Sequence, residues 1–328
     1  MVIWDVFCIF VYINQEITMR YTPNFNRFNS LFDLVSYFCT EEKCEKFITA
    51  NRWGDDVVCP YCGHHHCYTR TDGRFKCREC NSNFSCKVGT IFDNTKISLR
   101  KWFMAMYLIS CHKKGISSVQ LAIDIKVSQK TAWNMLQKIR VLFKQDDSVA
   151  LEGEVECDEM YLGGRETNKH ESKRTANTQG RSIKTKTPIF GMVERMGNIR
   201  AMKVSDTKRS TLQMLIGQFV ADGSHLYTDE YQAYNGLGDN YQHSVVQHGA
   251  KQFVKGSSST NTIEGFWAHF KRMVFGTYHF VSVKYLQRYI DEAVYRWNTQ
   301  LSDEGERFDM MLSKSIGICT YQDVKDVA

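Results

Sequence analysis

The chain has 328 residues, of which 43% are hydrophobic and 13% aromatic, so it is long enough for two or three domains with buried cores. Its net charge of +6, from 42 basic and 36 acidic side chains, permits a polyanionic partner without requiring one. This composition excludes a chain that is disordered throughout. The apolar opening over residues 1–13 is shorter than the roughly 20 residues that span a bilayer, and it lacks a basic flank and a cleavage site. We interpret it as a packed or β-prone extension, or as sequence upstream of a start at Met19.

The first element expected after this extension is helical and lies within residues 27–52. Its apolar residues Leu31, Leu34, Val35 and Phe38 follow helical spacing. Asn29 or Ser30 is the expected N-cap.

A cysteine-rich segment, residues 53–92, predicts a zinc ribbon. Four of the chain's twelve cysteines fall in two Cys-x-x-Cys pairs, Cys59 with Cys62 and Cys77 with Cys80. Each pair can form a knuckle, and the 14 residues between them leave room for a β-hairpin whose second strand is "RFKCREC". Four thiolates fill a tetrahedral shell, so this zinc is expected to be structural. The alternative is four buried or disulfide-linked cysteines.

Residues 98–145 are expected to be helical, and "GISSVQLAIDIKVSQKTAWNMLQKIRVLF" has the spacing of a helix-turn-helix. Ser117 or Ser118 begins the first helix, and Ser128 caps the second. Gln129, Lys130, Asn134 and Lys138 are expected to face outward, toward base edges and phosphates. The residues assigned to DNA contact are Ser128, Gln129, Lys130, Thr131, Asn134, Lys138 and Arg140. The alternative is a helical hairpin whose basic residues are merely solvated.

From residue 151 on, strand-like runs alternate with helical ones, which predicts an α/β domain over residues 151–310. The strand-like runs are "GEVECDEMYLGG", "IFGMVERMGNIRAMKV" and "HLYTDE". The segment 163–188 has seven basic residues against two Glu and no apolar periodicity, so it is expected to be a surface loop. It is either a solvated linker or a basic arm that lies on phosphates.

Three acids are candidates for one metal site. Asp158 and Asp229 are placed at or near strand ends, and Glu264 opens the helical stretch "NTIEGFWAHFKR". Carboxylates gathered in this way repel one another unless divalent cations lie between them. Two Mg²⁺ ions could activate an attacking oxygen and stabilise a leaving oxygen at a phosphodiester. Lys271, seven residues after Glu264, lies on roughly the same helix face and could hold a phosphate.

Each acid also has an ordinary explanation. Asp158 and Glu159 are adjacent, so strand phase decides which of them points into a site. Asp229 is also suited to a turn or an N-cap, and Glu264 to the first turn of a helix, where the helix dipole favours an acid. Trp267 is expected to pack in the core rather than stack on a base.

Six stretches, in order from about residue 50 to about residue 298, resemble the Merlin superfamily of DNA transposases and its bacterial insertion-sequence relatives. They are "RWGDDVVCPYCG", "FKCREC", "KGISSVQLAIDIKVSQKTAWNMLQKIR", "VECDEMYLGG", "LYTDEYQAY" and "TNTIEGFWAHFKRMVFGTYH". The resemblance implies an RNase H-like core with a DDE-type acid triad, which maps onto Asp158, Asp229 and Glu264, followed by Lys271. Some relatives have Asn at the third position, so Asn261 is a reserve candidate. His248 is either an auxiliary DNA or phosphate contact or a structural histidine.

The resulting expectation is a DNA transposase that binds terminal inverted repeats and target DNA, with catalytic Mg²⁺ or Mn²⁺ and structural Zn²⁺. A homodimer or larger synaptic assembly is expected because two element ends must be held together. The location is expected to be intracellular and DNA-associated: the nucleus in a eukaryotic host, the cytoplasm or nucleoid in a bacterial one. The alternatives are a transposase-derived DNA-binding regulator, an RNase H-like nuclease without strand transfer, and a zinc-ribbon transcription factor without enzymatic activity.

The expected fold is therefore multidomain α/β, with a zinc ribbon and a helix-turn-helix region ahead of an RNase H-like catalytic domain. The expected boundaries are 1–52 for the N-terminal extension and helical segment, 53–92 for the zinc ribbon, 93–150 for the helix-turn-helix region, 151–310 for the catalytic domain and 311–328 for a C-terminal tail.

Overall fold

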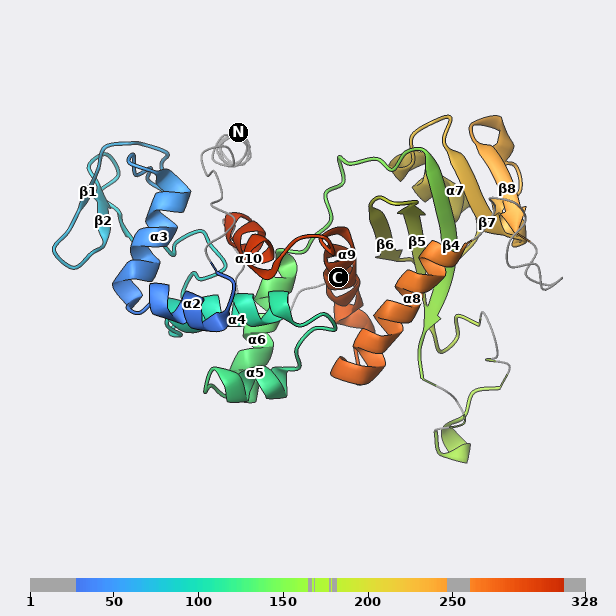
Figure 1. The fold of residues 1–328 in the computed structure, drawn as a ribbon, viewed down its shortest axis with the longest axis horizontal. Helices are drawn as coiled ribbons and strands as arrows, with labels where there is room; N and C mark the ends of the chain where they lie inside the picture. Colours follow the sequence, from blue (N-terminus) through green and yellow to red (C-terminus); the bar gives the residue numbers. More distant parts are fainter. Residues whose placement is uncertain are drawn as a thin grey trace. The chain divides into compact units, whose positions relative to one another are not determined.

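The structure is a computed structural model that describes residues 28–164, 167, 169–176, 178, 182–246 and 260–315 (Figure 1). The chain divides into two compact units, Met1–Leu142 with Ser302–Ala328, and Phe143–Leu301. None of the described helices is long and apolar enough to cross a membrane. The predicted extension over residues 1–26 and His248 lie outside the described residues.

The first unit is mainly helical and carries a small sheet. Ser30 caps its first helix, as the sequence predicted, since its Oγ accepts a hydrogen bond from Asp33 N at 3.1 Å. Thr40 caps a separate second helix, so the predicted helical segment is two helices. The elements in chain order are α2 (Leu31–Tyr37), α3 (Glu41–Trp53), β1 (Cys67–Thr69), β2 (Phe75–Cys77), β3 (Asn83–Phe84), α4 (Leu99–Cys111), α5 (Ser118–Asp124), α6 (Gln129–Val141) and α10 (Glu304–Ser313).

Helix α10 belongs to the first unit, whereas the sequence placed residues up to 310 in the catalytic domain. Phe308 is completely buried and its ring contacts those of Phe28, Phe103 and Tyr107. An apolar helix face shows that a helix packs on a core, but its periodicity does not show which core. The boundary at residue 310 is therefore wrong, and residues 304–313 form a packed helix of the first unit.

The second unit is built on a five-stranded mixed sheet in the order β6-β5-β4-β7-β8. The first three strands along the chain pair antiparallel, while β7 and β8 run parallel to β4. This topology is RNase H-like, as the sequence predicted. The elements are β4 (Glu154–Leu162), β5 (Thr187–Glu194), β6 (Ile199–Lys203), α7 (Arg209–Phe219), β7 (His225–Asp229), β8 (Gln242–Val246), α8 (Asn261–Met273) and α9 (Leu286–Asn298).

Short helical turns complete this unit. They are the 3-10 turns η3 (Glu171–Lys173), η4 (Gln232–Tyr234), η5 (Leu237–Asp239) and η8 (Val283–Tyr285), and the π-helical turn η7 (Val274–Tyr278). The described part of the predicted basic loop, residues 163–188, holds only η3 before strand β5 begins at Thr187.

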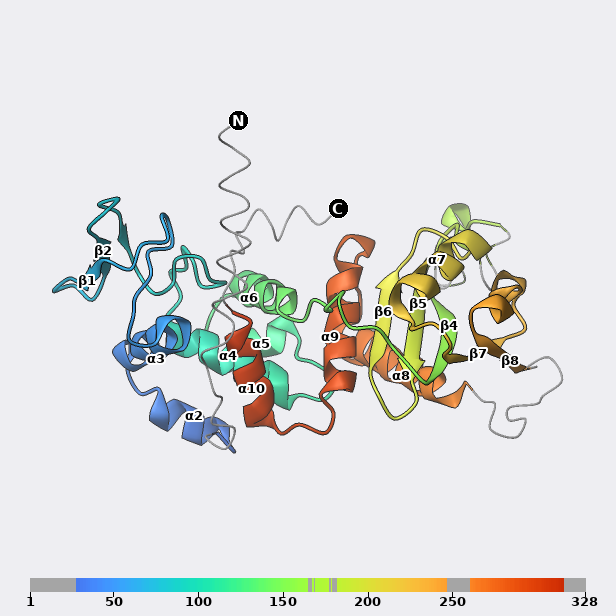
Figure 2. The same cartoon turned by 90° about the horizontal axis from the view of Figure 1, so that it is seen from above.

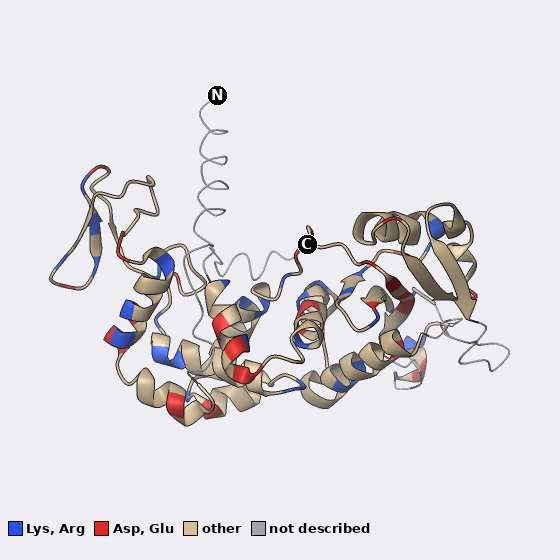
Figure 3. Cartoon of the chain, turned by 45° about the horizontal axis from the view of Figure 1, so that its top comes forward, with Lys and Arg blue, Asp and Glu red and all other residues tan. Residues whose placement is uncertain are grey.

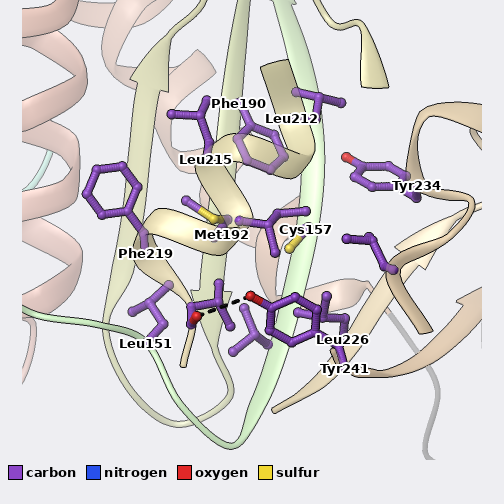
Figure 4. Packing of buried hydrophobic residues seen from close by; sticks show 14 of the residues in the cluster. Leu151, Cys157, Phe190, Met192, Leu212, Leu215, Phe219, Leu226, Tyr234 and Tyr241 are labelled. Carbon is purple, nitrogen blue, oxygen red and sulfur yellow. Dashed lines mark hydrogen bonds between the residues drawn. The ribbon is translucent and has the colours of Figure 1, made fainter. Parts of the chain in front are cut away.

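Helices cover both faces of the sheet (Figure 2). On one face, α7 packs over residues of β4, β5 and β7, including Cys157, Phe190 and Leu226 (Figure 4). On the opposite face, α8 and α9 pack over residues of β4, β5 and β6, including Met160, Ile189 and Ala201. Side chains along β4 alternate between these two cores, which fixes the face to which each acid of the strand points.

Gly191 marks the closest approach of α8 to the sheet. A Cβ atom at this position would lie 2.6 Å from Cζ2 of Trp267 and 3.1 Å from Cδ1 of Ile263. We expect Gly191→Ala to lower the free energy of unfolding by about 1–3 kcal/mol because it overpacks this core. Gly217→Ala in α7, where a Cβ meets nothing within 4 Å, should instead raise it by about 0.5–1 kcal/mol. Urea unfolding checks both changes, and equal effects would contradict the packing assigned to Gly191.

Candidate functional site

The two Cys-x-x-Cys pairs meet at one end of the small sheet. The Sγ atoms of Cys59, Cys62, Cys77 and Cys80 all lie within 4.8 Å of one another. Cys59 Sγ is 3.6 Å from Cys80 Sγ, and Cys62 Sγ is 3.6 Å from Cys77 Sγ. A tetrahedral zinc shell with Zn–S bonds of about 2.3 Å places its sulfurs about 3.8 Å apart, so the four thiols fit structural zinc.

The predicted hairpin between the pairs is present, and β3 adds a strand that the sequence did not predict. Burial raises the pKa of Cys59 to about 12, whereas hydrogen bonds from the Ser82 hydroxyl and backbone N–H lower that of Cys80 to about 6. Two other potential zinc ligands close to the four thiols have contacts of their own. His65 bonds to Asp56, and Cys67 donates to the His64 carbonyl.

The helix-turn-helix is formed by α5 and α6. Ser117 caps α5 by accepting from Gln120 N at 3.1 Å, and Ser128 caps α6 by accepting from Thr131 N at 3.2 Å. Leu121, Ala132, Leu136 and Ile139 are buried between the helices and their neighbours. The exposed residues at the start of α6 are Ser128, Gln129 and Lys130, while Thr131 and Asn134 are partly buried.

Two of the predicted DNA contacts do not face outward. Lys138 is buried and its Nζ donates to the carbonyl of Ile91 at 3.1 Å, and Arg140 is only 1% exposed. Residues Met135–Arg140 are all buried because the second half of α6 is covered on several sides, including the segment around Ile91. The prediction that Lys138 and Arg140 contact DNA is therefore wrong for this fold.

Asp158 lies in the middle of β4, not at its end, because the strand continues to Leu162. Its side chain points to the α8 face, where its Oδ2 accepts a hydrogen bond from Trp267 Nε1 at 3.0 Å. Glu159 points to the opposite face and accepts a hydrogen bond from Tyr234. Because successive side chains of a strand point to opposite faces, Asp158 lies on the side of the sheet that α8 covers and Glu159 does not.

Asp229 is the last residue of β7, the strand that runs parallel to β4. The pairing of the two strands aligns Glu156 with Tyr227, and continuing this register by two residues places Asp158 opposite Asp229. Asp229 Oδ1 accepts from Tyr231 N at 2.9 Å, so this carboxylate also caps the turn that follows the strand. The ordinary explanation of a turn acid and the explanation of a site acid are thus compatible.

Glu264 lies in the first turn of α8, where its Oε1 accepts from Thr260 Oγ1 at 3.3 Å. Asn261, the reserve candidate, is the exposed first residue of this helix. Lys271 and Arg272 are exposed in its last turn. The positions of the Lys and Arg residues along the ribbon are blue in Figure 3. Glu264 and Lys271, two turns apart, therefore share the exposed side of the helix.

The three acids interact electrostatically at this place. Burial, together with the negative charges of Asp229 and Glu264, raises the pKa of Asp158 to about 6, although hydrogen bonds from Glu159 N–H and Trp267 act to lower it. Asp158 is thus the acid that is coupled to both others. This is the pattern that convergent carboxylates produce.

The donor set suits hard divalent cations, since Mg²⁺ and Mn²⁺ prefer carboxylate oxygens and would offset the repulsion that raises the Asp158 pKa. Among the described residues, only the four zinc-ribbon thiols form a set of three or more donors that all lie within 4.8 Å of one another. The three carboxylates are therefore not drawn as closely together as a single ion would hold them. Two ions about 3.5–4 Å apart do not require such closeness, so Asp158, Asp229 and Glu264 would be suited to hold a pair of ions rather than a single one.

Comparison with known sequences assigns the family. The profile of the ISXO2-like transposase domain matches residues 150–298, and that of the transposase zinc-ribbon domain matches residues 39–83. An uncharacterized protein in transposable element ISH50 of Halobacterium salinarum is 30% identical over 244 residues, which cover 70% of this chain and 82% of that protein. The chain belongs to the ISXO2-like transposase family. The resemblance to transposases of insertion sequences is thereby confirmed.

Solved structures of the Mos1 transposase share a weaker likeness with this transposase. The Mos1 strand transfer complex is 13% identical, with a TM-score of 0.28, over 66% of this chain and 79% of that chain. A pre-cleavage Mos1 transpososome is 12% identical, with a TM-score of 0.27, over 92% of this chain and 100% of that chain. Because these TM-scores are low, the candidate site of this transposase is described from its own residues alone.

Sequence reasoning missed the polar residues around the acids of the transposase. It placed Trp267 in the core, where it is indeed buried, but not its hydrogen bond to Asp158. It also missed Glu156, which is buried on the same face of β4 as Asp158. A signal existed, because Glu154, Glu156 and Asp158 repeat with the period of a strand and place three acids on one face.

The hydrogen bond from Trp267 gives a direct test. Trp267→Phe keeps an aromatic ring in the core but removes the N–H that orients Asp158, so we expect DNA cleavage to slow by roughly 10–100-fold. Trp297→Phe is the matched control, since Trp297 packs edge-on against Phe266 in the same core. Cleavage rates of both variants, at matched thermal stability, check the prediction. A Trp267→Phe variant as fast as the control would show that the hydrogen bond is not needed.

Proposed function

We propose that this transposase binds the terminal inverted repeats of its element and cuts and joins DNA strands in a metal-dependent reaction at Asp158, Asp229 and Glu264. The observation that carries the proposal is the electrostatic coupling of Asp158 to both other acids on one face of an RNase H-like sheet. A buried acid with neighbouring negative charges is costly to the fold, and such acids cluster at functional sites. The family assignment supplies the class of reaction.

The three acids would hold two Mg²⁺ or Mn²⁺ ions. When bound, such ions activate an attacking oxygen and stabilise the charge on a leaving oxygen. The protein's own part is positioning. Trp267 holds one oxygen of Asp158, Tyr231 N–H holds one oxygen of Asp229, and Thr260 holds one oxygen of Glu264. No covalent protein nucleophile is required, because water and a 3′-hydroxyl can attack in turn at one site.

Basic residues near the acids would bind the DNA backbone. Lys271 and Arg272 are exposed at the C-terminal end of α8, on the helix that carries Glu264. Salt-sensitive phosphate contacts of this kind hold DNA without reading its sequence. Asn261 stays a reserve candidate as an auxiliary oxygen donor in the same helix.

We assign recognition of the DNA sequence to the first turns of α6 and to the zinc ribbon. The residues of α6 that remain after the correction above are Ser128, Gln129, Lys130, Thr131 and Asn134. Gln129 Nε2 donates to Ser118 Oγ at 2.8 Å, so this side chain would have to change partner to reach a base. Because two element ends must be held together during transposition, we propose that at least two copies act in one complex.

A supercoiled plasmid that carries two element ends tests the function. With purified protein and Mg²⁺, the proposal expects double-strand cleavage at the ends and joined products with a second plasmid. Products nicked or cut but never joined would indicate a nuclease. Specific binding without any cleavage would indicate a regulator. Either result would overturn the proposal.

A further inference from the structure

Another carboxylate on the α8 face of β4, that of Glu156, accepts hydrogen bonds from four donors. Glu156 is fully buried. Its Oε2 accepts from the backbone N–H groups of Thr262 and Ile263 at 2.9 and 3.0 Å, and its Oε1 accepts from Thr262 Oγ1 at 3.1 Å. Arg195 Nε donates to the same Oε1 at 2.9 Å. Four donors from two separate segments thus converge on one side chain.

This carboxylate replaces the cap that α8 lacks. Thr260, the N-cap residue, makes no side-chain hydrogen bond to the first N–H groups of the helix. Those groups need an acceptor, and the positive end of the helix dipole favours an anion. A strand residue supplies both here, so the start of α8 is attached directly to β4.

Arg195 extends the attachment to β7. Its Nη1 donates to Glu154 Oε2 at 3.1 Å, and its guanidinium lies over the ring of Tyr227, 3.9 Å from the centroid. Tyr227 in turn donates its hydroxyl to Glu154 Oε1 at 2.9 Å. A buried charge is tolerated when it is paired and hydrogen-bonded in this way, and such a pair has few alternative arrangements.

The members of this network stand in a regular relation to the site acids. Glu156 precedes Asp158 by two residues, Tyr227 precedes Asp229 by two, and Thr262 precedes Glu264 by two. In the strands, a step of two keeps the same face, so the network lies directly beside the acids on the sheet. The network therefore contacts β4, β7 and α8, the three elements that carry the acids, each at a residue close to its acid.

We propose that Glu156, with Arg195 and Tyr227, is a positioning residue that sets the separation of Asp158, Asp229 and Glu264 by fixing α8 against β4 and β7. The inference rests on the proposed function, because it assigns the network a role at that site. Glu156 itself touches neither DNA nor metal in this proposal, since all its oxygens are occupied by the donors above.

The test uses Glu156→Gln in the full-length chain, with Mn²⁺ as the probe. Glutamine keeps the shape of the side chain but turns an N–H₂ group toward donors. We expect Mn²⁺ affinity, followed by electron paramagnetic resonance, to fall by roughly 10–100-fold, as losses of supporting contacts around metal ligands do. Cleavage should fall with it, while binding to element ends stays within a few-fold. Backbone hydrogen exchange over residues 260–266 should accelerate.

Glu194→Gln is the matched control. Glu194 also accepts backbone N–H groups, from Glu152 and Asn198, both at 3.1 Å, but these contacts do not involve β7 or α8. It should leave Mn²⁺ affinity and exchange in α8 unchanged. Tyr227→Phe is a milder variant, which removes one hydroxyl and keeps the ring under Arg195. It should show a smaller loss of the same kind, which keeps the test decisive if Glu156→Gln does not fold.

Two results would overturn the inference. One is that both Glu156→Gln and Tyr227→Phe bind Mn²⁺ with wild-type affinity. The other is that Glu194→Gln loses as much Mn²⁺ affinity as they do. Failure of the proposed function has a different signature. In that case the wild-type chain neither binds Mn²⁺ through the three acids nor cleaves DNA. Hydrogen exchange in α8 then decides alone: acceleration in Glu156→Gln but not in Glu194→Gln supports the attachment, and equal exchange refutes it.

Discussion

Asp158→Asn is expected to slow DNA cleavage by at least about 10³-fold while specific binding to element ends stays within a few-fold of wild type. Metal ions at a phosphodiester supply several kcal/mol of charge stabilisation, and about 4 kcal/mol corresponds to this factor. Asparagine keeps an oxygen that can accept from Trp267 but removes the charge that both other acids sense. Single-turnover cleavage of a labelled element end measures the effect.

Glu159→Gln is the control, because Glu159 is the next residue of the strand but points to the opposite face, toward Tyr234. Its cleavage rate should stay within a few-fold of wild type. If Asp158→Asn cleaves at the wild-type rate, or if both variants lose activity equally, then Asp158 does not have the role assigned to it.

The same substitution should stabilise the metal-free protein at neutral pH. The folded protein holds the Asp158 pKa at about 6, above the ordinary 3.8, so the folded state binds the proton more tightly than the unfolded state. Stability therefore falls as pH rises from about 4 to about 6, and the neutral amide avoids this loss. In buffer without Mg²⁺ or Mn²⁺ and without a chelator, so that the structural zinc stays bound, we expect a gain of about 1–3 kcal/mol from Asp158→Asn at pH 7.5, and none at pH 4. A gain that does not depend on pH would contradict this explanation.

The second large effect is expected at the zinc ribbon. Cys77→Ser should abolish zinc binding and unfold residues 53–92, with loss of specific binding to element ends. The three strands of the ribbon have only three, three and two residues, too few to persist alone. Zinc binding contributes roughly 10–16 kcal/mol to the folding of comparable small domains. Zinc content by atomic absorption and end binding by gel shift measure the two losses.

Cys39→Ser controls for the loss of a thiol as such, since Cys39 is exposed and outside the cluster. It should keep one zinc per chain and normal end binding. A Cys77→Ser protein that still holds one zinc and still binds element ends would show that another ligand set holds the metal.

The sequence could single out the three candidate acids because their surroundings are local. The period of two in β4, the short strand before Asp229 and the polar start of α8 are all visible in the sequence, and neighbouring strands bring them together. The ambiguity between Asp158 and Glu159 needed the structure, because a shift of one residue exchanges the faces of a strand. The hydrogen bonds of Asp158 with Trp267 and of Glu159 with Tyr234 place the two side chains on opposite faces.

The wrong predictions involve contacts between segments that are distant in the sequence. Lys138 has the sequence context of an exposed basic residue, yet its ammonium group is buried and donates a hydrogen bond to the carbonyl of Ile91. Helix α10 returns to Phe28 and Phe103, contacts that no local pattern specifies. Glu156 was missed for the same reason, since its partners Arg195 and Thr262 lie 39 and 106 residues away. Tertiary contacts decide such roles, and propensity does not.

Anomalous diffraction from crystals of the wild-type transposase grown with Mn²⁺ tests the central claim most directly. The account predicts manganese peaks bounded by the carboxylates of Asp158, Asp229 and Glu264, and their loss in Asp158→Asn crystals grown in the same way. Manganese bound only elsewhere, with these three side chains turned apart, would contradict it.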